Sequence, residues 1–216
     1  MPAVRTRAPR RAASRAVENS VRRRGYARVA GADEAGRGSL AGPVVAAAVI
    51  LDPDRRLPGL RDSKLLTPAQ RERLYALIVT RATWAVAVAP VADVDRLNVH
   101  RASLDAIRRA VEALSPPGNY AIVDGFRVPG LDLPHEAILR GDRRCAAIAA
   151  ASIVAKVTRD REMVRLHTLD GRYGFDQHKG YGTRLHLDAI ARHGYSDAHR
   201  RTFTTAAGRA TSAVVC

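Results

Sequence analysis

Two adjacent carboxylates, Asp33 and Glu34, stand at the end of an apolar stretch and run directly into glycines. The segment 31–43 has the sequence GADEAGRGSLAGP. Hard divalent cations such as magnesium prefer oxygen ligands, and two such ions can clamp the attacking and leaving oxygens of a phosphodiester. The pair therefore predicts a carboxylate metal site, and further acids should converge on Asp33.

Two other acids also lie beside a glycine. Asp124 ends the apolar run 120–123 and is followed by Gly125, while Asp142 comes directly after a glycine. If the two apolar runs form neighbouring parallel strands, Asp124 lies beside Asp33 at one edge of the sheet. Asp124 is therefore the best second contributor to the site, and Asp142 is a plausible third.

The glycine-rich segment has two other interpretations. One is a turn with solvated acids, and the other is a dinucleotide fingerprint, since Gly36, Gly38 and Ala41 match G-x-G-x-x-A. A dinucleotide fold needs a full helix after the glycines, but only five residues separate Gly38 from the next strand-like run. The two carboxylates would also repel a pyrophosphate, so we reject the fingerprint.

Asp160 competes with Asp142 for a place in the site. It lies between two arginines in a predicted helix, where a salt-bridged or solvated acid is ordinary, so we prefer Asp142. Four histidines suggest zinc, but they are irregularly spaced and have no cysteine nearby. We interpret them as structural or surface residues: His178, His186, His193 and His199.

The chain is strongly basic. Its 216 residues include 36 Lys plus Arg against 21 Asp plus Glu, a formal net charge of +15. Such an excess favours a polyanionic partner, and nucleic acid is the first candidate. The basic residues are almost all Arg, a bias that coding composition alone could produce, but the sign of the charge remains.

The basic excess is concentrated at the N-terminus. Residues 1–28 contain nine Arg and a single acid, Glu18, with almost no large apolar residue. We therefore expect residues 1–27 to be a disordered tail or frayed helix that contacts nucleic acid, and 28–216 to be one catalytic domain. An organellar transit peptide is the alternative for the tail.

Other classes of protein are disfavoured. The longest charge-free stretch, 38–51, is shorter than the ~20 apolar residues that a bilayer crossing needs. Cys145 and Cys216 are far apart and fit neither a disulfide framework nor a zinc site. We expect a cytoplasmic protein without a membrane partner. It should be monomeric, because no exposed apolar stripe stands out.

The pattern of apolar residues predicts an α/β domain. Strands are expected at 29–32, 44–51, 84–88, 120–123 and 137–139. Helices are expected from a cap at Thr67 through Ile78, over 98–114, and over 146–157 with a charged continuation to 165. A last helix should begin at the cap Thr183 and stop at Gly194.

These segments together resemble bacterial ribonuclease HII. The shared strings, in the family's order and spacing between about residues 30 and 203, are DEAGRG, DSK, VDG, GD, AASIVAKVTRDREM and HKGYGT. The resemblance implies a ribonuclease H-like fold, a mixed central sheet flanked by helices with a helical C-terminal extension. It also implies an endonuclease that cuts RNA in RNA/DNA hybrids and cuts 5′ of ribonucleotides embedded in duplex DNA, leaving 3′-hydroxyl and 5′-phosphate ends.

The resemblance also implies roles for particular residues. The family's four carboxylates, which hold two magnesium or manganese ions, match Asp33, Glu34, Asp124 and Asp142. The residues that match its nucleic-acid contacts are Gly36, Arg37 and Gly38 at the minor groove, Lys64 at a phosphate, and Tyr181 at the sugar of an RNA-to-DNA step.

The chain departs from the family at two positions. Ser39 stands where proline is frequent, and Leu65 stands where a second lysine is common. These departures bear on the rigidity of the loop and on one phosphate contact.

Two rival functions stay open at this point. One is a non-catalytic nucleic-acid-binding protein, which the retained acid set argues against. The other is a related nuclease or integrase of the same fold, which would cleave without requiring a ribose at the cut.

Overall fold

The computed structural model describes residues 12–203, in which five strands form a mixed sheet. The strands are β1 (Val29–Ala35), β2 (Val44–Leu51), β3 (Ala82–Ala89), β4 (Tyr120–Asp124) and β5 (His135–Ile138). They lie in the order β3-β2-β1-β4-β5, with β2 antiparallel to β1 and β3, and with β1, β4 and β5 parallel. The predicted mixed sheet is confirmed, and β1 is its central strand.

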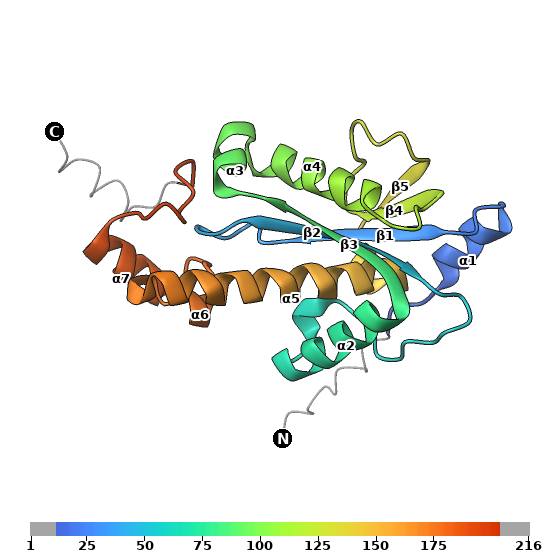
Figure 1. The fold of residues 1–216 in the computed structure, drawn as a ribbon, viewed down its shortest axis with the longest axis horizontal. Coiled ribbons are helices and arrows are strands. Elements are labelled where there is room, and N and C mark those ends of the chain that lie inside the picture. The colour runs from blue at the N-terminus through green and yellow to red at the C-terminus, as the bar shows by residue number, and fades with distance from the viewer. Residues whose placement is uncertain (1–11, 204–216) are drawn as a thin grey trace, which may run out of the picture.

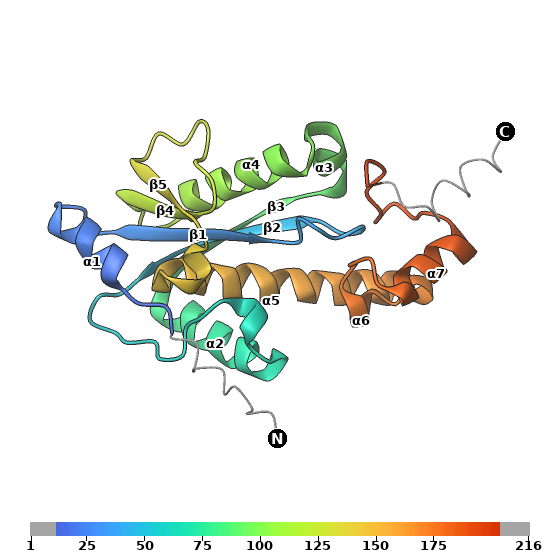
Figure 2. The same cartoon turned by 180° about the vertical axis from the view of Figure 1, so that it is seen from behind.

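Helices cover both faces of the sheet (Figures 1 and 2). On one face lie α3 (Val91–Leu97) and α4 (Val99–Glu112), and on the other lie α1 (Ala16–Arg23), α2 (Pro68–Arg81) and α5 (Ala146–Leu169). The long α5 continues past the sheet to α6 (Phe175–His178) and α7 (Arg184–His193). Short 3₁₀ turns are η1 (Ser63–Leu65), η2 (Gly141–Arg143) and η3 (Gly171–Tyr173). Between residues 12 and 203, no helix is long and apolar enough to cross a membrane.

Strand β2 shows how the two layers are joined. All eight of its residues are buried. Because side chains alternate along a strand, Ala47, Val49 and Leu51 pack on the α5 side, while the residues between them pack on the α4 side. A strand covered on both faces has a continuous apolar sequence, as this one does.

Helix α5 lies directly against β1 because small residues face each other. A Cβ placed on Gly31 would overlap the backbone of Ala147. The first ten residues of α5 are all buried, and six of them are alanine. This close approach places the polar residues of α5 next to the end of β1.

Several predicted elements are confirmed together with their caps. The Thr67 hydroxyl accepts from the Gln70 amide, and the Gln70 side chain accepts from the Thr67 amide, which completes a capping box at the start of α2. The Thr183 hydroxyl accepts from the His186 amide at the start of α7. These local signals needed no tertiary information.

Two other predicted elements are present with shifted bounds. The helix expected over 98–114 begins at Val99 because Asn98, at φ 66°, interrupts the chain and caps α4, while α3 precedes it unpredicted. The strand expected at 137–139 is β5, His135–Ile138, because its register pairs Ala121 with His135. Leu139 lies outside it and is 72% exposed.

Of the two expectations for residues 1–27, a disordered tail or a frayed helix, the described part shows a helix, and residues 1–11 lie outside the described residues. Residues 16–23 form α1, which buries Val21 in the core. Glu18 is also buried, and its Oε1 accepts a 2.7 Å hydrogen bond from the Ala147 amide. The start of α5 has no side-chain cap of its own, so Glu18 supplies the acceptor from the far end of the chain.

Candidate active site

The strand pairing places Asp33 and Asp124 side by side. In the parallel pair of β1 and β4, Ala32 lies opposite Val123, so the next residue of each strand is one of these acids. The Oδ1 of Asp124 accepts a 2.6 Å hydrogen bond from the amide of Gly141. The expected approach of the two strand-end carboxylates is therefore present in the fold.

Asp142 reaches the same region through η2. A Cβ on Gly141 would displace the terminal methyl of Ile148 and approach Asp124, so glycine lets the turn pack closely against both. The Asp142 carboxylate is buried, and its pKa is raised by that burial and then by the negative charges of Asp62 and Asp124. Asp142 and Asp124 thus lie close enough to repel each other.

Asp33 and Glu34 lie on opposite faces of β1, with Asp33 on the α5 side. Burial raises the pKa of Asp33 well above its usual value, and the charges of Glu34 and Asp124 raise it further. Burial also raises the pKa of Glu34, although Arg37, whose Nη1 lies 3.2 Å from Oε1, opposes that shift. The buried carboxylates of the cleft therefore repel one another, and Arg37 and Lys64 offset that repulsion at Glu34 only in part.

Two adjoining cavities contain all nine residues that the sequence singled out. One of about 410 Å³ is lined by Asp33, and one of about 270 Å³ is lined by Asp142. Both are lined by Glu34, Arg37, Lys64 and Asp124. Because the cavities share these walls, we treat them as one cleft. The remaining predicted residues, Gly36, Gly38 and Tyr181, line the larger cavity.

The donor set of the cleft suits hard divalent cations. As they stand, no three His, Cys, Asp or Glu side chains of residues 12–203 are grouped closely enough to hold an ion. Nevertheless, four carboxylates face one cleft, and burial disfavours the charged form of at least three of them. A cation removes that penalty, and oxygen ligands are those that Mg²⁺ and Mn²⁺ prefer.

The segment around Lys64 is fixed by a fifth acid. Asp62 is buried and accepts from the Lys64 amide at 2.9 Å and from Arg143 Nε at 3.1 Å. Lys64 itself is exposed and lines both cavities. Asp62 therefore tethers Lys64 to the turn that bears Asp142.

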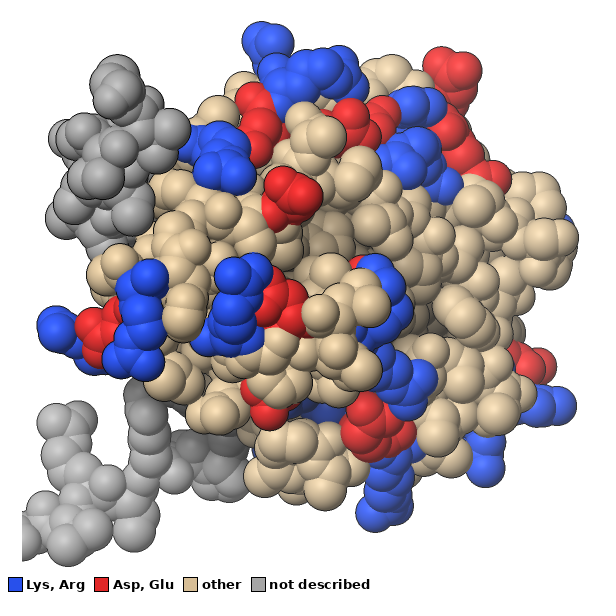
Figure 3. Space-filling view, turned by 60° about the vertical axis from the view of Figure 1, so that its left-hand side comes forward, with Lys and Arg blue, Asp and Glu red and all other residues tan. Residues whose placement is uncertain are grey.

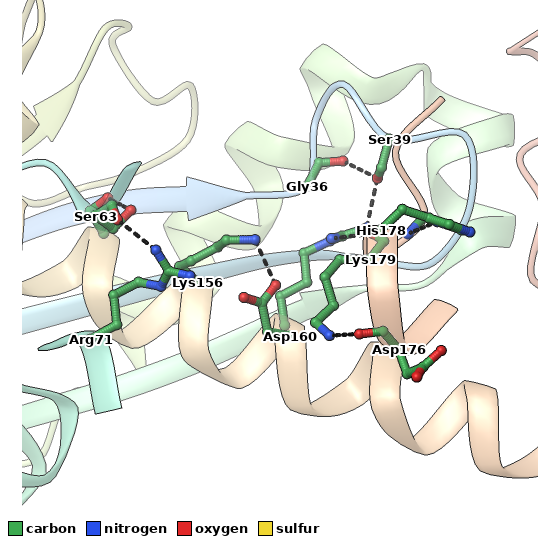
Figure 4. Close-up of polar contacts among 12 residues, drawn as sticks. Gly36, Ser39, Ser63, Arg71, Lys156, Asp160, Asp176, His178 and Lys179 are labelled. Carbon is green, nitrogen blue, oxygen red and sulfur yellow. Dashed lines mark hydrogen bonds and ion pairs between the residues drawn. The ribbon is translucent and has the colours of Figure 1, made fainter. Parts of the chain in front are cut away.

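Asp160 does not share this cleft. Its Oδ1 lies 2.6 Å from Lys156 Nζ, and Figure 4 shows this ion pair on α5. Asp160 lines a separate cavity of about 610 Å³ between α2, α5 and α6, which adjoins the cleft through Lys156 and Tyr181. The interpretation of Asp160 as a salt-bridged helical residue is confirmed, although its partner is Lys156 rather than a neighbouring arginine.

Of the four histidines interpreted as structural or surface residues, His193 is exposed. The other three form a histidine cluster with two aromatic rings: His178, His186, His199, Tyr173 and Phe175. His186 Nε2 lies 3.1 Å from His199 Nε2, and His186 Nδ1 lies 3.0 Å from the Tyr181 carbonyl. Burial lowers the pKa of His186 and of His199 to about 4. The cluster therefore packs as neutral rings behind Tyr181.

Sequence reasoning missed several residues of the cleft. Ser152 lies beside Asp33, and its Oγ is 2.9 Å from Ser63 Oγ. Ser152, Lys156 and Arg159 recur at helical spacing in an otherwise apolar segment, which is the signal that could have revealed them. Others come from loops without such a signal: Phe126, Leu139, Arg140 and Arg143.

Comparisons with known sequences agree with this geometry. The family model described as Ribonuclease HII matches residues 30–206. A ribonuclease HII of Salinispora tropica is 52% identical over 195 residues, which cover 89% of this chain and 72% of the relative. A ribonuclease HII of Dechloromonas aromatica is 54% identical over 176 residues, which cover 81% of this chain and 90% of the relative.

A solved structure gives the same result for the fold. The crystal structure of ribonuclease H2 from Pyrococcus horikoshii superposes with a TM-score of 0.71 at 28% identity. The match covers 85% of this chain and 96% of that one. The sheet, the helices on its two faces and the C-terminal helices therefore belong to a known architecture.

Proposed function

The chain belongs to the ribonuclease HII family, and on that premise we propose how its cleft selects and cuts a substrate. The protein is a metal-dependent ribonuclease H, an endonuclease that hydrolyses phosphodiester bonds. Its proposed substrates are RNA/DNA hybrids and duplex DNA with embedded ribonucleotides. The cut lies 5′ of the ribonucleotide and leaves 3′-hydroxyl and 5′-phosphate ends, as ribonucleotide removal requires.

The observation that carries the proposal is the crowding of buried carboxylates around one cleft. Asp33, Glu34, Asp124 and Asp142 would hold two Mg²⁺ or Mn²⁺ ions. Bound there, the ions would activate the attacking water and stabilise the leaving oxygen. The carboxylates themselves contribute the negative charge and the oxygen donors that such ions require.

The cations at the rim act on the substrate backbone. Arg37 and Lys64 line both cavities, Lys156 lines one, and Arg140 and Arg143 line the other. Cationic side chains attract phosphates, and this attraction weakens as salt rises. We assign these residues to holding the strand across the carboxylates.

The selectivity for ribose comes from the glycine loop and Tyr181. Gly38 has no atom within 4 Å of a Cβ position, so the loop leaves room beside the cleft for a sugar. Tyr181 is 36% exposed, and its ring lies 5.5 Å from Lys156 Nζ and from Arg159 Cζ. A half-exposed ring placed there can pack on the deoxyribose that follows the ribonucleotide at an RNA-to-DNA step. At that second position, the extra hydroxyl of a ribose would crowd the ring.

A non-catalytic basic binder fits the structure less well. Figure 3 shows Lys and Arg lying among Asp and Glu on the face that it presents. A protein that used only its positive charge would not place buried acids along its cleft. A monomer in the cytoplasm remains our prediction for this protein.

The test is a cleavage assay with a matched pair of tyrosine variants. Tyr181→Ala should lose about tenfold or more in activity on a duplex with one embedded ribonucleotide, the size expected for one aromatic packing contact. It should lose less on a long RNA/DNA hybrid assayed with Mn²⁺. The control is Tyr75→Ala, which removes a half-buried tyrosine that lies beside Arg161 outside the cleft. Equal losses on both substrates would show that Tyr181 is a general folding or binding residue.

A further inference from the structure

The loop that follows β1 rests on two buried arginines that come from distant parts of the chain. Arg159 lies on α5 and Arg200 lies after α7, and both are 0% exposed. No carboxylate of the described residues forms an ion pair with either guanidinium. Their partners are instead oxygens of the loop 36–43, together with one carbonyl from Lys179.

Arg200 gathers three carbonyls of this loop. Its Nη2 donates to Gly36 O at 2.7 Å and to Gly42 O at 2.8 Å, its Nη1 donates to Arg37 O at 2.9 Å, and its Nε donates to Gly42 O at 3.0 Å. One planar guanidinium thus fixes both ends of the turn. A lysine has no such fork of donors.

Arg159 reaches the same loop through Ser39. Its Nη2 donates to Ser39 Oγ at 2.7 Å, and the Ser39 hydroxyl donates onward to Gly36 O at 2.8 Å, as Figure 4 shows for Ser39 and Gly36. Ser39 is one of the two departures from the family pattern. In this chain, two hydrogen bonds through its side chain supply the restraint that a proline ring would give.

The inward carbonyls determine where the amides point. In a trans peptide, the C=O of one residue and the N–H of the next point in opposite directions. Because Gly36 O and Arg37 O face Arg200, the amides of Arg37 and Gly38 face away from it. Neither amide has an acceptor among residues 12–203, and both residues line the cleft.

The two glycines of the loop have different roles. A Cβ on Gly36 would collide with the Arg159 guanidinium, and its φ of +97° is also unfavourable for other residues. A Cβ on Gly38 would meet open space. Gly36 therefore allows the loop to lie on the arginines, whereas Gly38 keeps the outer side clear for a ligand.

Stability alone does not explain this arrangement. Burial and the nearby charge of Arg159 lower the pKa of Arg200 to about 10, so the fold pays for keeping two like charges close together. An acid beside them would relieve that repulsion, but it would also cancel the positive charge under the loop. With only uncharged oxygens as partners, carbonyls and the Ser39 hydroxyl, the positive charge stays available to strengthen the outward amides as donors.

We propose that Arg200, assisted by Arg159 and Ser39, is a positioning residue that turns the Arg37 and Gly38 amides outward as a fixed pair of donors to the 2′ oxygen of the substrate ribose. This inference rests on the proposed function. Arg200 itself touches no substrate. Its effect should therefore appear in the discrimination between ribose and deoxyribose rather than in general affinity for duplex.

The experiment measures the dissociation constants of two duplexes that differ by one 2′-hydroxyl, with Ca²⁺ in place of Mg²⁺ and strand integrity checked on a gel. Arg200→Lys should weaken binding of the ribose duplex by about tenfold, the size of a lost hydrogen bond to a charged group, and leave the all-DNA duplex unchanged. Ser39→Ala should give a smaller change in the same direction, about threefold, as expected for a neutral hydrogen bond.

Two matched controls separate positioning from folding. Arg15→Lys removes a guanidinium that also donates to three loop carbonyls, those of Asp52, Pro53 and Arg55, none of which lines the cleft. Ser103→Ala removes a buried hydroxyl bonded to Val99 O. Both should keep the ratio of the two dissociation constants at the wild-type value, even if their melting temperatures fall.

The possible outcomes are distinct. An unchanged ratio in a folded Arg200→Lys protein overturns the proposal, as does an equal change in Arg15→Lys. If Arg200→Lys fails to fold, the Ser39→Ala variant tests the proposal instead. Its melting temperature should barely change, while its preference for the ribose duplex, measured as the ratio of the two dissociation constants, should shrink. If the wild-type protein shows no preference for ribose, the proposed function fails instead.

Discussion

The cleft and the histidine cluster both bury titratable groups, but they handle them in opposite ways. In the cluster, His186 and His199 are neutral, and their ring nitrogens bond to each other, to Tyr181 O and to Ser196. In the cleft, Asp33 is also buried and accepts from the Glu34 amide, yet the charges of Glu34 and Asp124 still repel it. Buried polar groups that are satisfied locally support the fold, whereas those left in conflict beside a cavity indicate a missing ligand.

The largest effect should come from removing one carboxylate of the cleft. Asp124→Asn should lower turnover on a duplex with one ribonucleotide by about 1,000-fold or more, because it removes charge where transition-state charge is balanced. Binding of the duplex should change little. The control Asp132→Asn, which neutralises an exposed acid between β4 and β5, should behave as wild type. Near-normal turnover in Asp124→Asn would contradict the assignment of Asp124 as a metal ligand.

A second test compares the two acids that compete for the site. Asp142→Asn should reduce turnover by about 100-fold, the scale on which single electrostatic groups act in active sites. Asp160→Asn should have an effect of less than about threefold, because it breaks only a partly exposed ion pair with Lys156. Steady-state rates, with folding checked by circular dichroism, measure both. Equal losses would mean that the wrong acid was chosen.

The histidine cluster should show itself in stability rather than in activity. The unfolded chain binds protons on His186 and His199 near pH 6.5, but the folded protein does so only near pH 4. The free energy of unfolding should therefore fall as pH drops from 6.5 towards 4, by roughly 2 kcal/mol for each histidine. Urea titrations of wild type and His199→Gln should give a shallower pH dependence for the variant, and identical slopes would contradict this account.

The smallest effect is a gain in stability at the cleft. The pKa of Asp33 is raised in the folded state, so its ionised form opposes folding at every pH above that raised value. Without metal at pH 7.5, Asp33→Asn should melt about 2–4 °C higher than wild type, equivalent to ~1 kcal/mol in a domain of this size. The difference should shrink towards pH 4 and in the presence of Mg²⁺. A variant that melts at a lower temperature than wild type would show that the Asp33 carboxylate stabilises the fold.

Local patterns predicted much of the fold and most of the cleft. The apolar runs that end at Asp33 and Asp124 indicated two strands, and their polar ends indicated a shared edge. The helix caps at Thr67 and Thr183 were also predictable from the sequence alone. In each case, neighbouring residues determine the structure.

The features that were missed depend on partners far away in the sequence. Helix α1 is rich in arginine and looks unable to bury itself, but Glu18 finds an amide 129 positions later. Arg200 contacts carbonyls more than 150 positions earlier. The periodicity of apolar residues in the sequence does not predict such contacts, because each involves a single side chain that bonds to the backbone of another element.

The close approach of Gly31 and Ala147 has a consequence for how this protein tolerates mutation. Any side chain at Gly31 must push α5 away from β1, and that helix carries Ser152, Lys156 and Arg159, while β1 carries Asp33. A genetic screen for inactive variants should therefore return Gly31 alongside the carboxylates, although it can bind neither metal nor nucleic acid. Its inactive alleles should include alanine, the smallest possible replacement, because the collision is with the backbone of Ala147 and Ile148 rather than with a side chain that could move aside.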